Sequence, residues 1–227
     1  MKAMLLAAGM GRRMLPLTAD CPKPLLTVRG VTLIEHHLLN LKAAGITEVV
    51  VNAAYLAHKI VEFCGDGSQW GLNLKVSTEP EPLETAGGII RALPLLGDVP
   101  FMVVNADIWC PFPFQTLFHQ VLPRAGAHLV LTRNPAHNPN GDFSLSSYEL
   151  VELPSKEALT YTGIAVFHHD FFSGVAPGKR PLKPLLDAAI ASKLVTGERW
   201  NGPWEDIGTP ERLDALRTRF RGSGERP

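Results

Sequence analysis

The sequence predicts an α/β fold of three layers, with a mostly parallel central sheet between two layers of helices. Short apolar runs alternate with segments of helical periodicity along the chain, a pattern typical of strands joined through crossover helices. The length of 227 residues is enough for one full hydrophobic core. The sequence contains no internal repeat and no long low-complexity linker. We therefore expect a single domain over residues 1–227.

The first strand is expected at residues 2–8, an apolar run that is too short to span a membrane and that ends in a glycine-rich loop. The next element should be a helix over residues 32–44. Thr32 and Glu35 have the spacing of a capping box, and Gly45 follows the last turn.

The alternation continues to the C-terminus. A strand at residues 48–52 precedes a helix at 54–64, which ends at Gly65. Later apolar runs predict further strands, and two later helices each begin at a proline. The strands are expected at 74–78, 101–105, 128–132 and 160–168, and the helices at 184–193 and 210–219. The polar tail, residues 221–227, is expected to fray.

The charge of the chain favours a small anionic ligand. The formal net charge is zero, which disfavours nucleic acid and anionic membranes as partners. Residues 1–30, however, contain five basic residues and the single acid Asp20. The three cysteines have no paired spacing, which argues against a disulfide framework or a zinc site and is compatible with a reducing cytoplasm.

The loop after the first strand has the composition of a phosphate-binding loop. Gly9 and Gly11 allow backbone amides to approach a phosphate chain, and Arg12 and Arg13 supply guanidinium donors. Met14 stands where the dinucleotide-binding pattern needs a third glycine, and no Walker motif is present. A tight turn with two solvated arginines is the alternative interpretation.

A lysine between two prolines follows this loop. Pro22 and Pro24 restrict the backbone on both sides of Lys23, so its side chain is presented in a defined direction, as a phosphate contact requires. A plain surface lysine is the alternative.

Together, residues 6–18 and the Pro-Lys-Pro segment resemble the sugar-1-phosphate nucleotidyltransferases. The family pattern is Leu-Ala-Ala-Gly-x-Gly-x-Arg-Leu/Met-x-Pro-Leu-Thr, followed by Pro-Lys-Pro. The resemblance implies a three-layer Rossmann-like nucleotidyltransferase fold, Mg²⁺ as cofactor, and transfer of a nucleotidyl group from a nucleoside triphosphate to a sugar 1-phosphate. The nucleotide contacts that it implies in this region are Ala8, Gly9, Gly11, Arg12, Arg13 and Lys23. Arg13 would hold the leaving pyrophosphate, and Lys23 the α-phosphate or the sugar phosphate.

Two acidic motifs are expected to meet at the metal. Asp107 follows the strand at 101–105, where open α/β sheets bind ligands, and Asp206 lies far downstream. The family places its metal aspartates at these two motifs, so Asp107 is also a catalytic candidate, and Asn105 would contact nucleotide and sugar. The alternative for Asp107 alone is a turn cap.

The resemblance also implies contacts to the base and the sugar. Glu79 would accept a hydrogen bond from a pyrimidine such as uracil, and a turn at Gly88 would lie close to the nucleotide. Asp142 and Gly163 would contact the sugar. A proline-rich loop and two ordinary turns are the alternatives. Three basic residues are left open as ligands of the sugar phosphate: Lys179, Arg180 and Lys183.

Within the family, the chain is most similar to compact members that transfer UMP from UTP to N-acetylmuramate 1-phosphate, which implies a role in cell-wall sugar recycling in the cytoplasm. A mannose-1-phosphate guanylyltransferase is the second hypothesis. A non-catalytic nucleotide-sugar-binding protein is the third, because Met10 and Leu15 stand where relatives often carry basic residues. The oligomeric state is left open.

Overall fold

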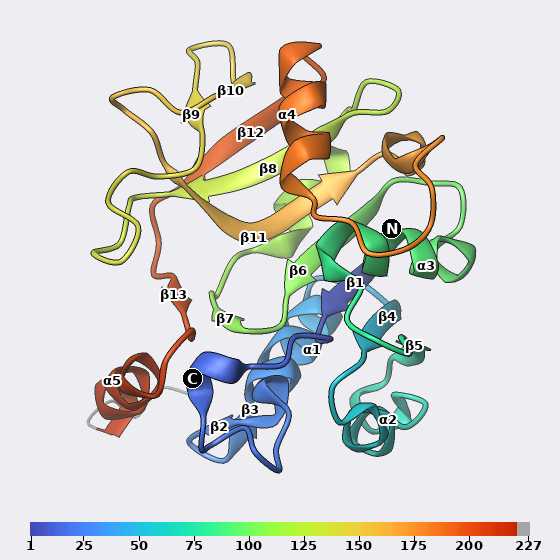
Figure 1. Cartoon of the computed structure of the whole chain (residues 1–227), viewed down its shortest axis with the longest axis vertical. Coiled ribbons are helices and arrows are strands. Elements are labelled where there is room, and N and C mark those ends of the chain that lie inside the picture. The colour runs from blue at the N-terminus through green and yellow to red at the C-terminus, as the bar shows by residue number, and fades with distance from the viewer. Residues whose placement is uncertain (222–227) are drawn as a thin grey trace.

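The structure, a computed structural model, describes residues 1–221, so most of the predicted tail lies outside the described residues. A seven-stranded sheet in the order β12-β8-β11-β6-β1-β4-β5 forms its centre (Figure 1). Its strands are β1 Lys2–Leu6, β4 Glu48–Ala53, β5 Asn73–Thr78, β6 Phe101–Asn105, β8 Ala127–Thr132, β11 Thr160–Phe167 and β12 Val195–Trp200. Neighbouring strands pair in parallel except at β11, which runs antiparallel to β6 and β8. The prediction of a mostly parallel sheet is confirmed.

Helices cover both faces of this sheet (Figure 1). Their bounds are α1 Leu33–Ala43, α2 Ala57–Cys64, α3 Glu84–Leu96 and α4 Lys183–Ala191. In β1, Ala3 and Leu5 pack with side chains of α1 and α2, whereas Met4 packs with those of α3 and α4. Successive residues of a strand point to opposite faces, so both faces of the sheet are buried. No helix within residues 1–221 has the length and apolar character needed to cross a membrane.

A third apolar cluster lies beside the sheet, around α5 (Pro210–Arg221). Leu213, Leu216 and Phe220 of this helix pack against Met14 and Trp109. The cluster therefore packs helix α5 against the segment that follows β1. The remaining short strands are β2 Thr27–Val28, β3 Val31–Thr32, β7 Ile108–Trp109, β9 Ser144–Leu145, β10 Val151–Glu152 and β13 Glu205–Asp206. The short 3-10 helices are η1 Arg12–Met14, η2 Lys23–Leu25, η3 Ser68–Trp70, η4 Phe114–His119 and η5 His169–Phe172.

Helix α1 begins as its sequence predicts, with one change. The hydroxyl of Thr32 accepts a hydrogen bond from the backbone N–H of Glu35, at 3.2 Å. The carboxylate of Glu35 does not complete the capping box, because it accepts from the indole N–H of Trp70 at 3.0 Å. Gly45, with φ of 93°, follows the helix as expected.

Helix α3 contradicts the turn that was expected at Gly88. Gly87, Gly88 and Pro94 all lower helix propensity, yet all three lie inside this helix. The glycines are required by close packing. A Cβ on Gly87 would lie 2.3 Å from the carbonyl oxygen of Gly178, and one on Gly88 would lie 2.7 Å from Asn52 Nδ2. Tertiary contacts therefore override local propensity here.

Candidate active site

A cavity of about 210 Å³ opens at the carboxyl ends of β1, β4 and β6. This is the edge at which parallel α/β sheets bind ligands. The residues that line it come from the ends of these strands, the loop after β1, η2 and the start of α3. They are Leu6, Ala7, Ala8, Gly9, Lys23, Pro24, Asn52, Pro82, Glu84, Thr85, Asn105 and Asp107. We refer to this space as the first cavity.

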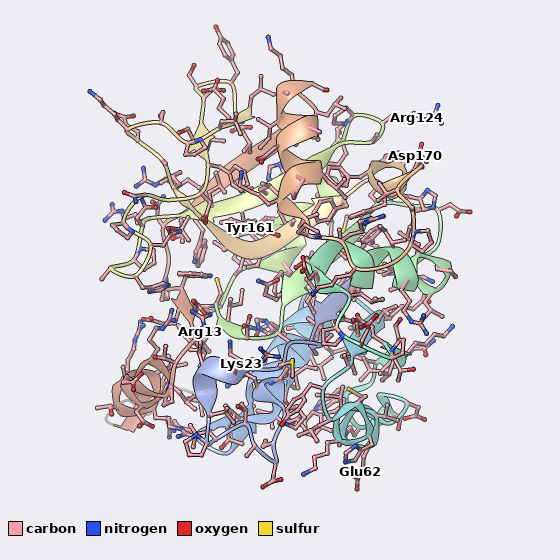
Figure 2. The ribbon with its side chains drawn as sticks, in the orientation of Figure 1. Arg13, Lys23, Glu62, Arg124, Tyr161 and Asp170 are labelled. Atoms are coloured by element: carbon pink, nitrogen blue, oxygen red, sulfur yellow. The ribbon has the colours of Figure 1, made fainter. Side chains whose placement is uncertain are left out.

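The glycine-rich loop after β1 turns back on itself. Gly11 has φ of 59°, and a Cβ at this position would lie 3.0 Å from Thr18 Cγ2. Thr18 Oγ1 donates to the carbonyl of Gly11 at 2.9 Å, which closes the turn. In η1, Met14 is buried while Arg12 and Arg13 are exposed. Figure 2 shows Arg13 and Lys23 on the connection between β1 and α1. Of the two, Lys23 lines the first cavity.

Lys23 and Asp107 form an ion pair at the wall of the first cavity. The Lys23 Nζ donates to Asp107 Oδ2 at 2.5 Å, although 84 residues separate them in the sequence. Lys23 is only 7% exposed. The pair therefore places one buried cation and one carboxylate where a ligand would meet both.

A two-stranded ribbon brings the second acidic motif to the first. β13 pairs antiparallel with β7, so that Asp206 lies opposite Ile108. The N–H of Ile207 donates to the carbonyl of Asp107 at 3.0 Å. The Asp206 carboxylate accepts from Arg212 Nη1 at 2.6 Å and lies 3.3 Å from His137 Nε2. Asp206 thus lies in β13 and Asp107 directly before β7, so that the backbones of the two acidic motifs adjoin.

Two carboxylates on one ribbon fit the chemistry of a magnesium site. Mg²⁺ prefers hard oxygen ligands, and protein sites often supply one or two carboxylates while phosphate oxygens and water complete the octahedron. Among the described residues, no group of three or more His, Cys, Asp or Glu side chains is arranged to hold a metal. Asp107 and Asp206 would therefore need a phosphate ligand to complete such a site.

Both carboxylate oxygens of Glu79 accept hydrogen bonds from other residues of the chain. Its Oε1 accepts from Asn52 Nδ2 at 2.6 Å, and its Oε2 accepts from the N–H of Leu83 at 2.9 Å. The oxygen of the same Asn52 amide accepts from the N–H of Ala7 at 2.8 Å. This network joins the ends of β1 and β4 to the segment before α3. Glu79 is 4% exposed and does not line the first cavity, so its contact with a base stays a prediction.

A second cavity, of about 480 Å³, adjoins the first and shares Glu84, Thr85 and Asn105 with it. Its other lining residues are Asp142, Phe143, Tyr161, Pro181, Leu182, Lys183 and Leu186. Asp142 accepts from the N–H of Tyr161 at 2.8 Å and from Asn138 Nδ2 at 3.2 Å.

Gly163 sets the position of Asn105, the residue at the junction of the two cavities. Gly163 has φ of 86°, and a Cβ there would lie 2.6 Å from Asn105 Nδ2. Absence of a side chain at this position therefore allows the amide of Asn105 to occupy the junction.

His37 supports the strand that follows Asp107. Its Nε2 lies 2.8 Å from the carbonyl oxygen of Ile108 and donates to it, which leaves Nδ1 as an unprotonated, buried nitrogen. Burial of the ring lowers the pKa of His37 to about 4. Cys110, which follows on the same segment, is buried, and burial raises the pKa of its thiol to about 12. The thiol is thus protonated at neutral pH and is no nucleophile.

Five of the residues predicted to contact the nucleotide or the metal line the first cavity: Ala8, Gly9, Lys23, Asn105 and Asp107. Six others do not line it: Gly11, Arg12, Arg13, Glu79, Gly88 and Asp206. The sequence analysis missed Asn52 and Pro82. Asn52 is the last residue of the strand predicted at 48–52, so a polar residue at a strand end was the available signal.

The comparisons with known proteins agree on one family. Residues 2–219 match the nucleotidyl transferase family. The chain is 46% identical to an N-acetylmuramate alpha-1-phosphate uridylyltransferase of Neisseria meningitidis, over 94% of the chain and 95% of that protein. It is 30% identical to a mannose-1-phosphate guanyltransferase of Hypocrea jecorina, over 93% of the chain and 62% of that longer protein. A Bacillus anthracis structure described as a glucose-1-phosphate thymidylyltransferase superimposes with a TM-score of 0.85, at 20% identity, and the alignment covers 100% of this chain and 97% of that one.

Proposed function

This chain belongs to the nucleotidyl transferase family, and we propose that it transfers UMP from UTP to N-acetylmuramate 1-phosphate and releases pyrophosphate. The observation that carries the proposal is the pair of adjoining cavities, with Lys23 and Asp107 in the first and Asn105 at the junction. A nucleotide and a sugar phosphate in adjacent sites are what this reaction needs. The likeness to a uridylyltransferase along nearly the whole chain supports the choice of substrates.

The reaction requires no protein nucleophile. An oxygen of the sugar phosphate, ionised at neutral pH, would attack the α-phosphorus of UTP, and the bond to the β-phosphate would break in line. The contribution of the protein would be positioning and neutralisation of charge. Backbone amides near Ala8 and Gly9 would meet the phosphates, Arg13 would hold the leaving pyrophosphate, and Lys23 would contact the α-phosphate.

Asp107 and Asp206 would hold Mg²⁺, which neutralises phosphate charge when bound. The ion pair with Lys23 has a consequence for this arrangement. A lysine ammonium that leaves the carboxylate for a phosphate oxygen keeps a charged partner, and the carboxylate becomes available to the metal. Lys23 and Asp107 would thus exchange partners when the nucleotide enters.

The direct test is pyrophosphate release from a panel of triphosphates and sugar 1-phosphates with Mg²⁺. We expect the highest kcat/KM with UTP and N-acetylmuramate 1-phosphate. A preference for GTP and mannose 1-phosphate would favour the guanylyltransferase hypothesis. Tight nucleotide-sugar binding without turnover of any pair would favour the non-catalytic hypothesis and contradict the proposal. In a cell, the proposed reaction would return a cell-wall sugar to its activated form in the cytoplasm, where UTP is made.

A further inference from the structure

The second cavity contains a feature that the reaction does not require, a lysine on the side away from the first cavity. Lys183 is the first residue of α4 and lines the second cavity without lining the first. Among the described residues that line the second cavity, it is the one cation. The sugar phosphate must reach the α-phosphorus in the first cavity, so its phosphate belongs at the junction near Asn105. Lys183 therefore faces another part of the sugar.

The Lys183 side chain is held in place but keeps free donors. Its Nζ lies 5.1 Å from the centre of the Phe143 ring, within the range of a cation–π contact. It also donates to Asp187 Oδ1 at 2.5 Å, one turn along α4. An ammonium has three N–H donors, and Asp187 accepts from one. The side chain is 52% exposed, so the remaining donors are accessible.

The two acids of the second cavity have partners of their own. Asp142 accepts hydrogen bonds from Asn138 and from the N–H of Tyr161. Glu84 lies 3.7 Å from the ammonium of Lys179. Lys183 thus remains the group in the cavity that would attract a second anionic group of a substrate. Leu182 and Leu186 beside it add an apolar wall.

We propose that the ammonium of Lys183 binds the carboxylate of the lactyl ether of N-acetylmuramate and thereby selects this sugar. N-acetylglucosamine is the same sugar without the lactyl group, so it offers no partner to Lys183. The apolar wall of Leu182 and Leu186 fits the methyl group of the lactyl ether. This proposal rests on the proposed function. It assigns a role to Lys183 and none to Lys179 and Arg180, which do not line either cavity.

The test compares two substrates in three proteins. The kcat/KM values for N-acetylmuramate 1-phosphate and N-acetylglucosamine 1-phosphate, each with UTP, are measured for the wild type, Lys183→Gln and the control Lys193→Gln. Lys193 is an exposed lysine just after α4 that lines neither cavity. Loss of a hydrogen bond to a charged group should lower kcat/KM of Lys183→Gln for the muramate substrate about tenfold to a hundredfold, mainly through KM. The value for the glucosamine substrate should change less than about threefold. The control should match the wild type with both.

An equal loss with both substrates would mean that Lys183 contacts a shared group such as the phosphate, and would overturn the proposal. An unchanged kcat/KM of Lys183→Gln for the muramate substrate would overturn it as well. If the wild type turns over another sugar 1-phosphate but not the muramate, the proposed function itself fails. Calorimetric binding of UDP-N-acetylmuramate and UDP-N-acetylglucosamine gives a second measurement that is independent of turnover. Lys183→Arg, which retains the charge, should recover part of the discrimination.

Discussion

The two cavities are built in different ways. The first is formed where β1, β4 and β6 end, and hydrogen bonds of Asn52 join the end of β4 to Ala7 after β1 and to Glu79 after β5. The second takes Asp142 from a loop and Lys183 from the start of α4. The irregular segment before α4, residues 174–182, contacts the start of α3, because the N–H of Arg180 donates to the carbonyl of Leu83 at 2.9 Å. We call the first cavity the rigid side, because hydrogen bonds join its strand ends, and the second cavity the sugar side. The sugar side combines residues of α3, β11 and α4 with loop residues such as Asp142 and Pro181. Because loops vary more readily than strand ends, one fold can keep its chemistry and change its sugar.

The largest effect is expected on the rigid side. Lys23→Met removes the cation that contacts Asp107 and, by the proposed mechanism, the α-phosphate. Loss of such a placed charge typically costs about 10²- to 10³-fold in kcat. The measurement is pyrophosphate release at saturating UTP.

Lys42→Met is a matched control, because Lys42 is exposed and donates only to the carbonyl of Gly71 among the described residues. It should keep the wild-type rate. A kcat of Lys23→Met within threefold of wild type would show that the phosphate is held elsewhere.

His37 makes the rigid side sensitive to acid. Its folded pKa of about 4 lies below its ordinary value of 6.5, so between these values the unfolded chain binds the proton more tightly. Stability from the neutral ring is complete above pH 6.5 and is lost as the pH falls towards 4. The total is about 3 kcal/mol at 1.36 kcal/mol per pKa unit. Urea unfolding of the metal-free protein from pH 7 to pH 4 measures it.

His37→Gln should be less stable than the wild type at pH 7, and its stability should fall less between pH 7 and pH 4. Parallel pH profiles for the two proteins would assign the acid sensitivity to other groups.

Gly163 tests how far the sugar side depends on the junction. Gly163→Ala forces an L residue to φ of 86° and places its Cβ against Asn105. Gly174→Ala is the control, because Gly174 has φ of 77° and a Cβ there meets nothing within 4 Å. Left-handed strain costs about 1–3 kcal/mol at either position.

Only Gly163→Ala should also raise KM for the sugar phosphate, because only it displaces the Asn105 amide. Thermal unfolding and steady-state kinetics of both variants separate these effects. Equal KM values of the two variants for the sugar phosphate would show that Asn105 does not contribute to sugar binding.

Prediction from sequence succeeded where local patterns decide the structure. The apolar runs located six of the seven strands of the sheet, all but β12, and the motif around Lys23 located the first cavity. It failed at α3, where Gly87 and Gly88 read as a turn. Those glycines are explained by backbone and side chains that approach from residues 178–180 and from Asn52 and Glu79, contacts that no local pattern contains.

Contacts between residues distant in sequence also explain why two features of the candidate site could not be predicted from local patterns. Each strand of the β7–β13 ribbon has two residues, too few to show a period, so only the family motif pointed to Asp206. For Glu79, the sequence predicted a contact with a base but not the hydrogen bonds that its two oxygens accept from Asn52 and Leu83.

The smallest effect is expected from adding a charge at Leu15, where the family resemblance implies a basic residue. Leu15 follows Arg12 and Arg13 and is 56% exposed, so Leu15→Arg adds a solvated cation close to the loop. Salt screens an exposed charge of this kind, and we expect KM for UTP to fall less than about threefold at 0.15 M salt. Leu17→Arg, at a second exposed leucine nearby, controls for general attraction of the nucleotide. A tenfold fall in KM with Leu15→Arg alone would mean that the rigid side lacks a phosphate contact. A small and equal change in both would mean that Arg13 and Lys23 already complete it.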